Sequence, residues 1–105
     1  MRKIIAVDFD GTLCLNNYPE IGKPIMPNIR KVKQFQREGC ILILWACRRG
    51  KELAEAIEWC KSMHNIEFDY INENAKESLE AFGGDTRKVY ANMYFDDSAH
   101  NPNWD

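Results

Sequence analysis

Two pairs of aspartates have the residue type and spacing for chemistry. Asp8 and Asp10 lie in "DFDGTL", directly after a short apolar run, and Asp96 and Asp97 lie in "YFDDSAH", after a later one. Four carboxylates in one crevice would repel one another unless a cation lay between them. Mg²⁺ prefers oxygen ligands and commonly keeps positions for substrate phosphate. The two motifs therefore predict a magnesium site, provided that the fold brings them together.

The sequence around these motifs alternates between apolar runs and helical patterns. Four runs have strand character, the first two apolar throughout: 4–7 ("IIAV"), 40–46 ("CILILWA"), 68–72 and 91–97. Three segments favour helix: 27–39, 50–65 and, more weakly, 75–82. Such alternation predicts a parallel sheet with right-handed crossovers and a ligand site at the carboxyl ends of the strands. We expect one α/β domain over residues 1–105, a three-layer α/β/α, Rossmann-like parallel sheet of four to five strands.

This topology would gather the chemical groups at one edge of the sheet. The first strand ends in "DFDGT", the second in "ACRRG" and the fourth in "DDS". Because the carboxyl ends of parallel strands meet at one edge, we expect Asp8, Asp10, Asp96 and Asp97 to converge there.

Composition excludes several classes of protein. The 105 residues carry 14 basic and 16 acidic side chains, interspersed, for a net charge of -2, so neither nucleic acid nor membrane is an expected partner. The four cysteines are scattered and are read as reduced thiols. Asp8 ends the first apolar run after four residues, too soon for a signal peptide or a membrane span. A bacterial-type cytoplasm is the expected location.

The motifs resemble those of the haloacid dehalogenase (HAD) superfamily, whose members are mostly Mg²⁺-dependent phosphatases. "DFDGTL" is similar to the first motif of that superfamily and "YFDDSAH" to its fourth. The stretches "YPEIG", "LILW" and "IEWC" resemble a small capless bacterial and phage subgroup. The resemblance covers nearly the whole chain and implies a HAD-type sheet without a cap domain.

The resemblance implies roles for the residues of the first motif. Asp8 would be the nucleophile that forms an aspartyl-phosphate, and Asp10 the general acid and base, with its main-chain carbonyl on the metal. Gly11 would let the strand unwind and bring N–H groups toward the phosphoryl oxygens, and Thr12 would steady the turn.

The resemblance also implies the remaining charged residues of the site. Asp96, with Asp97, would complete the Mg²⁺ shell. Lys88, eight residues before Asp96, matches the lysine of the third motif, which holds the nucleophile and the phosphoryl group. Arg87 is a neighbouring possibility, and a solvated charge on a helix face is the other reading of Lys88.

One position departs from the superfamily pattern. The second motif usually ends its strand with Thr or Ser, but Ala46 stands there, so only a backbone N–H remains to meet a phosphoryl oxygen. Loss of one such donor can cost about 10²–10³ in rate. Arg48 could replace it as a bidentate phosphate clamp. The alternative is that Arg48 and Arg49 are exposed charges.

Residues 13–26 are too few for a cap and are expected to form a short flap over an open pocket. Trp45 and Trp59 lie in segments of buried type and are expected in the core, as is the Cys14 thiol. Asn72 and Asn74 either contact substrate or belong to a plain surface connection. A homodimer is left open.

The function predicted on these grounds is a Mg²⁺-dependent phosphomonoester hydrolase that acts on a phosphorylated small molecule through an aspartyl-phosphate. The first alternative is a non-catalytic or weakly active phosphate-binding or regulatory module of the same fold, suggested by Ala46. The second, a receiver-like signalling domain, would carry its phosphoacceptor on a later strand than the one before "DFDGT".

Overall fold

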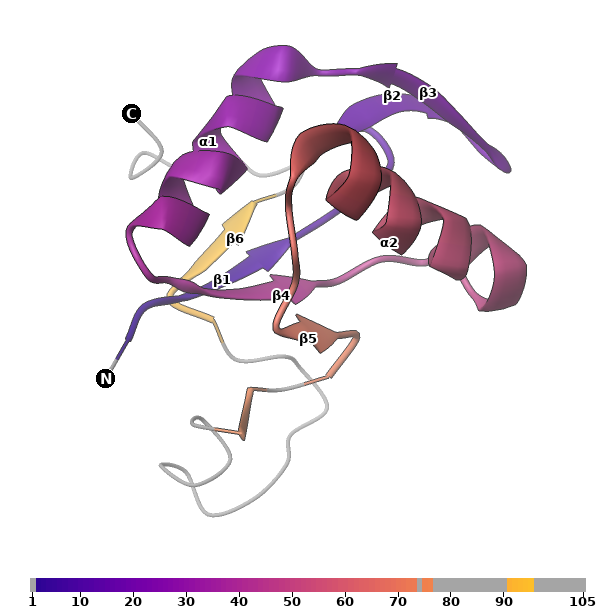
Figure 1. Ribbon diagram of the computed structural model, residues 1–105. Coiled ribbons are helices and arrows are strands. Elements are labelled where there is room, and N and C mark those ends of the chain that lie inside the picture. Colours follow the sequence, from indigo (N-terminus) through magenta and orange to yellow (C-terminus); the bar gives the residue numbers. More distant parts are fainter. Residues whose placement is uncertain (1, 74, 77–90, 96–105) are drawn as a thin grey trace.

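The apolar runs form one parallel sheet. The computed structural model describes residues 2–73, 75–76 and 91–95. Within them four strands pair in the order β5-β4-β1-β6 (Figure 1). Their bounds are β1 Ile4–Val7, β4 Ile41–Leu44, β5 Tyr70–Ile71 and β6 Met93–Phe95. All three neighbouring pairs are parallel, and Val7 is level with both Leu44 and Phe95, so the three strands end at one edge.

The two central strands are buried because every side chain in them is apolar. β1 ("IIAV") and β4 ("ILIL") have no residue more than 2% exposed. Such continuous apolar runs are typical of parallel strands covered on both faces. The expected strand at 40–46 is correct in kind but shorter, since Trp45 and Ala46 lie beyond its end.

Both described helices lie on the same face of the sheet (Figure 1). They are α1, Met26–Arg37, and α2, Gly50–His64. The chain advances from β1 to β4 to β5 in one direction, and right-handed crossovers then put both connecting helices on one side. α1 buries Ile29, Val32 and Phe35 there, as the one-turn spacing predicted.

The opposite face of the sheet is apolar as well. Ile4, Ala6, Ile41 and Ile43 form a second cluster together with Ala75. The expected helix at 75–82 lies almost entirely outside the described residues, so the three-layer arrangement stays a prediction. What the structure establishes is a four-stranded parallel sheet with two helices.

The expected flap is a β-hairpin. β2, Cys14–Asn17, and β3, Glu20–Pro24, pair antiparallel and extend beyond the carboxyl edge of the sheet (Figure 1). Gly22 is needed in β3 because a Cβ there would collide with the main-chain oxygen of Leu15. The hairpin therefore stands beside the edge where the aspartates were expected. No helix in the described part of the chain is long and apolar enough to cross a membrane.

Candidate functional site

A pocket of about 530 Å³ opens at the carboxyl edge of the sheet. Its lining includes Asp8, Ala46, Asn72, Trp45 and Tyr94. The chain passes from β1 to β4 on one side and later reaches β6 on the other side of β1, so the strand order reverses at β1. In open α/β sheets, ligands bind in the crevice at such a switch point.

Asp8 lies where the ends of β1 and β6 meet. Its main-chain N–H donates to the carbonyl oxygen of Phe95 at 2.9 Å. Phe95 immediately precedes Asp96 in the sequence, so the segment leading to the second acidic motif ends beside the first. Asp96, Asp97 and Lys88 themselves lie outside the described residues, and their roles stay predictions.

The chain turns sharply after Asp8, as expected. Gly11 has φ of 86°, a conformation that L side chains disfavour, and the N–H groups of Thr12 and Leu13 both donate to the carbonyl oxygen of Phe9. The Gly11 N–H donates to the carbonyl oxygen of Cys14 at 2.8 Å. In this arrangement Gly11 and Thr12 close the turn, and neither belongs to the lining of the pocket.

The hydroxyl of Thr12 is buried. The residue has no exposed surface, and within the described part of the chain its Oγ1 has no hydrogen-bond partner. A buried polar group left unpaired costs about 1–3 kcal/mol. Thr12 therefore steadies the turn through its main chain, whose carbonyl oxygen accepts from Asn28 at 2.8 Å, and not through its hydroxyl.

Arg48 binds Asp10 instead of facing solvent. Nε donates to Oδ2 and Nη2 to Oδ1 of Asp10, both at 2.8 Å, in a bidentate ion pair. Nη1 and Nη2 also donate to the carbonyl oxygens of Pro19, at 2.9 Å, and Glu20, at 2.8 Å, at the end of the hairpin. A longer contact of 3.5 Å joins Nη1 to the carbonyl oxygen of Glu52.

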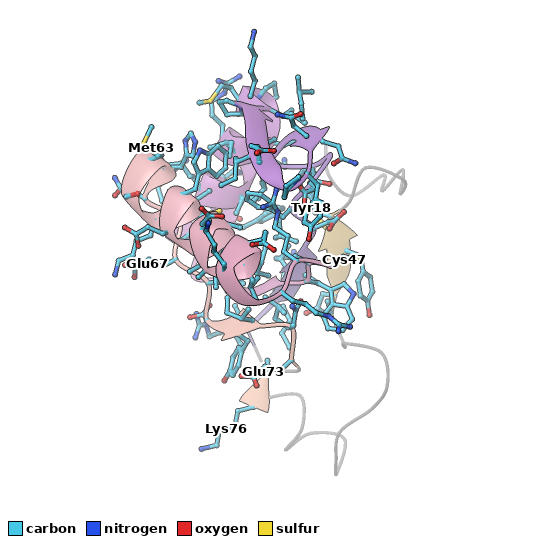
Figure 2. The ribbon with its side chains drawn as sticks, turned by 90° about the vertical axis from the view of Figure 1, so that its right-hand side faces the viewer. Tyr18, Cys47, Met63, Glu67, Glu73 and Lys76 are labelled. Carbon is cyan, nitrogen blue, oxygen red and sulfur yellow. The ribbon has the colours of Figure 1, made fainter. Side chains whose placement is uncertain are left out.

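Aromatic rings complete the enclosure of this guanidinium. Its central carbon lies 5.0 Å from the Phe9 ring centre and 5.1 Å from that of Tyr18, within cation–π range. The hydrogen bond to Asp10 raises the pKa of Arg48 above its usual value. Figure 2 shows Tyr18 and Cys47 on the same side of the molecule, near the start of α2.

The expectation for Arg48 is therefore corrected. The alternative of an exposed charge is wrong, since Arg48 is 1% exposed, whereas its neighbour Arg49 is exposed as expected. Arg48 lines the pocket, but its five hydrogen bonds use all the donors of the guanidinium. The role of phosphate clamp therefore stays a prediction, and it would require Arg48 to exchange one of these bonds for a phosphate oxygen. The sequence could not reveal this because the partners lie 28 to 38 residues away.

The backbone N–H at Ala46 is also engaged. It donates to Oδ1 of Asn72 at 2.8 Å. Asn72 follows β5 with φ of 52°, a left-handed conformation that asparagine tolerates. Ala46 thus has no hydroxyl and its N–H is paired, so a phosphoryl oxygen would have to displace Asn72 to reach it.

The fit of a Mg²⁺ ion can be tested on the first motif alone. Within the described residues no three His, Cys, Asp or Glu side chains are grouped to hold a metal. Asp8 lines the pocket, whereas the side chain of Asp10 is bound to Arg48. Because both side-chain oxygens of Asp10 are bound to Arg48, the main-chain carbonyl oxygen is the group of Asp10 that could bind the metal. Two oxygen donors of this kind suit a hard cation, and the rest of the shell would have to come from Asp96 and Asp97.

The cysteines are free thiols, as expected. Cys14, Cys40 and Cys60 are buried, and burial raises the pKa of Cys60 to about 12. Cys47 is exposed and lines the pocket.

Two aromatic residues of the pocket were not expected there. Trp45 was expected in the core, but it is 42% exposed, because β4 ends before it; Trp59 does pack against the core. Tyr94 was not singled out. Alternation along the strands indicates the face on which both lie, because Trp45 continues the series Ile41, Ile43 on the face of Asp8. Only the tertiary structure shows that the pocket opens at this part of the face.

Fold and site together define an α/β protein with a pocket at the carboxyl edge of a parallel sheet. No protein-family model matches the chain, and no curated protein matches it. Among solved structures, a conserved protein from Bacteroides thetaiotaomicron has 39% sequence identity and a TM-score of 0.80, over 99% of this chain and 84% of that one. This chain belongs to the same family as that protein.

Proposed function

We propose that the protein is a HAD-type, Mg²⁺-dependent phosphomonoester hydrolase that works through an aspartyl-phosphate on Asp8. The observation that carries the proposal is the position of Asp8, which ends β1 inside "DFDGTL", lines the pocket, and hydrogen-bonds through its N–H to the residue that precedes Asp96. A nucleophile at the switch point of a parallel sheet can meet a ligand in the crevice.

The first step is attack by a carboxylate oxygen of Asp8 on phosphorus. The new O–P bond forms as the ester P–O bond breaks, and its electron pair leaves with the alcohol oxygen. Water then attacks phosphorus, gives up a proton to a base, and releases inorganic phosphate and the free Asp8 carboxylate. A bound Mg²⁺ supplies charge neutralisation between the anionic nucleophile and the anionic substrate.

Asp10 is the base in this proposal, and Arg48 positions it. The bidentate pair fixes both carboxylate oxygens of Asp10. Arg48 in turn is held at the hairpin by its hydrogen bonds to the carbonyl oxygens of Pro19 and Glu20. Before Asp10 can take a proton from water or pass one to the leaving alcohol, one oxygen must exchange Arg48 for the substrate. A proton transfer of this kind contributes about 10²–10⁴ in rate.

The three-layer α/β/α arrangement is part of the same proposal. The second face of the sheet carries the buried side chains Ile4, Ala6, Ile41 and Ile43. We infer that the segment between β5 and β6 covers this face as a third layer. The connection from β5 to β6 runs across the sheet in the opposite direction to the connections from β1 to β4 and from β4 to β5, so a right-handed crossover places it on the face opposite α1 and α2.

The test is turnover of p-nitrophenyl phosphate with Mg²⁺ by wild type and Asp8→Asn. We expect turnover that EDTA abolishes and that Asp8→Asn lowers at least 10³-fold, about the scale expected when a group essential to the step is lost. Glu67→Gln is the matched control, since this carboxylate is exposed at the far end of α2 (Figure 2). Equal rates in wild type and Asp8→Asn would remove the enzymatic proposal.

A phosphate-binding module without significant turnover is the second candidate. It is favoured by the N–H of Ala46 being paired with Asn72 and by the full occupation of Arg48. In that case phosphate analogues bind with Mg²⁺ present, but no Asp8-dependent turnover is measured.

A further inference from the structure

The pocket beside Asp8 has aromatic walls on two sides. Trp45 directly follows β4, and its N–H donates to the Val7 carbonyl oxygen at 2.8 Å, so it lies next to Asp8 across the sheet. Tyr94, in β6, is paired with Ala6 on the other side of β1. Because neighbouring strands lie about 4.8 Å apart, the two aromatic residues flank the strand that carries the nucleophile.

These side chains share one face and leave space between them. Ala6 and Tyr94 belong to the cluster on the face opposite α1 and α2. Ala6 lies between the two aromatic residues and contributes only a methyl group to the floor of the pocket. Because Ala6 is small and Trp45 and Tyr94 are large, we expect a narrow groove between the two aromatic side chains, above the backbone of β1.

Trp45 belongs to neither of the two hydrophobic clusters that the described residues form. It is 42% exposed, and no ring contact to it occurs within the described residues. Trp59 differs, since its ring lies 5.6 Å from that of Phe9 and 4.4 Å from that of His64. A large indole held partly exposed at the mouth of a concave site is typical of ligand binding.

The pocket also has a cation without an ion-pair partner among the described residues. Arg49 lines the pocket and is exposed, and it forms no ion pair within the described residues. Arg48, by contrast, is bound to Asp10. Among the described residues that line the pocket, Arg49 is therefore the cation left to meet an incoming phosphate, in addition to the predicted Lys88.

We propose that this site takes small phosphomonoesters whose aromatic ring lies one or two bonds from the phosphate, with the ring against Trp45 and Tyr94. The ring must be close to the phosphate because Trp45 is a direct cross-strand neighbour of Asp8. A nucleobase, held away from its 5′-phosphate by ribose, would reach beyond this wall. The inference rests on the proposed function, since it takes Asp8 as the phosphate position.

The decisive measurement is calorimetric binding of two phosphonates in the presence of Mg²⁺. Benzylphosphonate and cyclohexylmethylphosphonate have the same charge and similar size, and only the first has a flat π face. We expect wild type to bind the benzyl compound roughly 5- to 150-fold more tightly, the range of one stacking contact. Trp45→Leu should lower this ratio below about twofold, and Trp45→Phe should keep most of it.

Met63→Leu is the matched control, because Met63 is exposed at the opposite end of α2 from Cys47 (Figure 2). Circular dichroism verifies that each variant is folded. The inference is overturned if wild type binds the two phosphonates with an affinity ratio near one, or if Trp45→Leu leaves this ratio unchanged. It is also overturned if wild type binds adenosine 5′-monophosphate more tightly than benzylphosphonate.

Measurements of phosphate hydrolysis distinguish a failure of this inference from a failure of the proposed hydrolase function. Asp8-dependent hydrolysis of acetyl phosphate with equal binding of the two phosphonates keeps the hydrolase and overturns the aromatic site. The expected phosphonate ratio with no hydrolysis of acetyl phosphate or benzyl phosphate keeps the aromatic site and overturns the hydrolase.

Discussion

Arg48 and Asp10, 38 residues apart in the chain, form a bidentate ion pair with both contacts at 2.8 Å. Asp10 lies in the turn after β1, and Arg48 lies in the segment between β4 and α2. Through the carbonyl oxygens of Pro19 and Glu20 the same guanidinium also holds the hairpin. One side chain thus connects the three segments that surround the carboxyl edge of the sheet.

Removal of Arg48 should destabilise the fold strongly. In Arg48→Met the largely buried Asp10 carboxylate loses its cation, and the carbonyl oxygens of Pro19, Glu20 and Glu52 lose a donor. We expect this to lower the free energy of unfolding by about 3 kcal/mol. Urea denaturation measures the change. The control is Arg49→Met, an exposed neighbour for which a change within about 0.5 kcal/mol is expected.

A double-mutant cycle attributes the effect to the pair. Arg48→Met combined with Asp10→Asn should give a coupling energy of about 1–3 kcal/mol. A coupling energy near zero would mean that Arg48 acts through the hairpin carbonyls alone.

Restoration of the missing hydroxyl should raise activity. In Ala46→Thr a hydroxyl is added at the wall of the pocket, and we expect kcat for p-nitrophenyl phosphate to rise about 10-fold or more, because one transition-state donor is worth up to about 10²–10³. Ala46→Val has the same shape without the hydroxyl and should show no gain. Equal changes in the two variants would assign the effect to bulk and not to hydrogen bonding.

The buried hydroxyl of Thr12 should be replaceable without loss of stability. Thr12→Val keeps the volume and removes a polar atom that has no partner among the residues the structure describes, so we expect the free energy of unfolding to rise by about 1 kcal/mol. Thr12→Ala leaves a cavity and should destabilise. Thermal or urea denaturation decides, and a loss of more than about 1 kcal/mol in Thr12→Val would show that the hydroxyl has a partner.

Alkylation should select one of the four cysteines. Because the thiolate is the reactive form and the pKa of buried Cys60 is raised to about 12, iodoacetamide at pH 8 should modify Cys47 and leave Cys14, Cys40 and Cys60 intact. Intact-mass measurement should show one adduct in the native protein and four in guanidinium chloride. Since Cys47 lines the pocket, a bound phosphonate should slow the reaction. Two or more rapid adducts in the native protein would contradict the burial.

The sequence by itself determined the local structure and the position of Asp8, the proposed nucleophile. Continuous apolar runs predicted β1 and β4, and residues spaced one turn apart predicted the buried side of α1. "DFDGTL" placed Asp8 at the end of the first strand, and Gly11 marked the turn that follows. These features depend on neighbours within a few residues, whose spacing the sequence contains directly.

The tertiary structure alone decided which distant groups meet. Strand order, and with it the crevice at β1, depends on pairings between segments far apart in the chain. The same holds for Arg48 with Asp10, for the Ala46 N–H with Asn72, and for Trp45 at the pocket instead of in the core. A polar or aromatic side chain has several favourable partners, and packing of the whole sheet with its hairpin selects one, because burial without a partner costs more than most single contacts contribute.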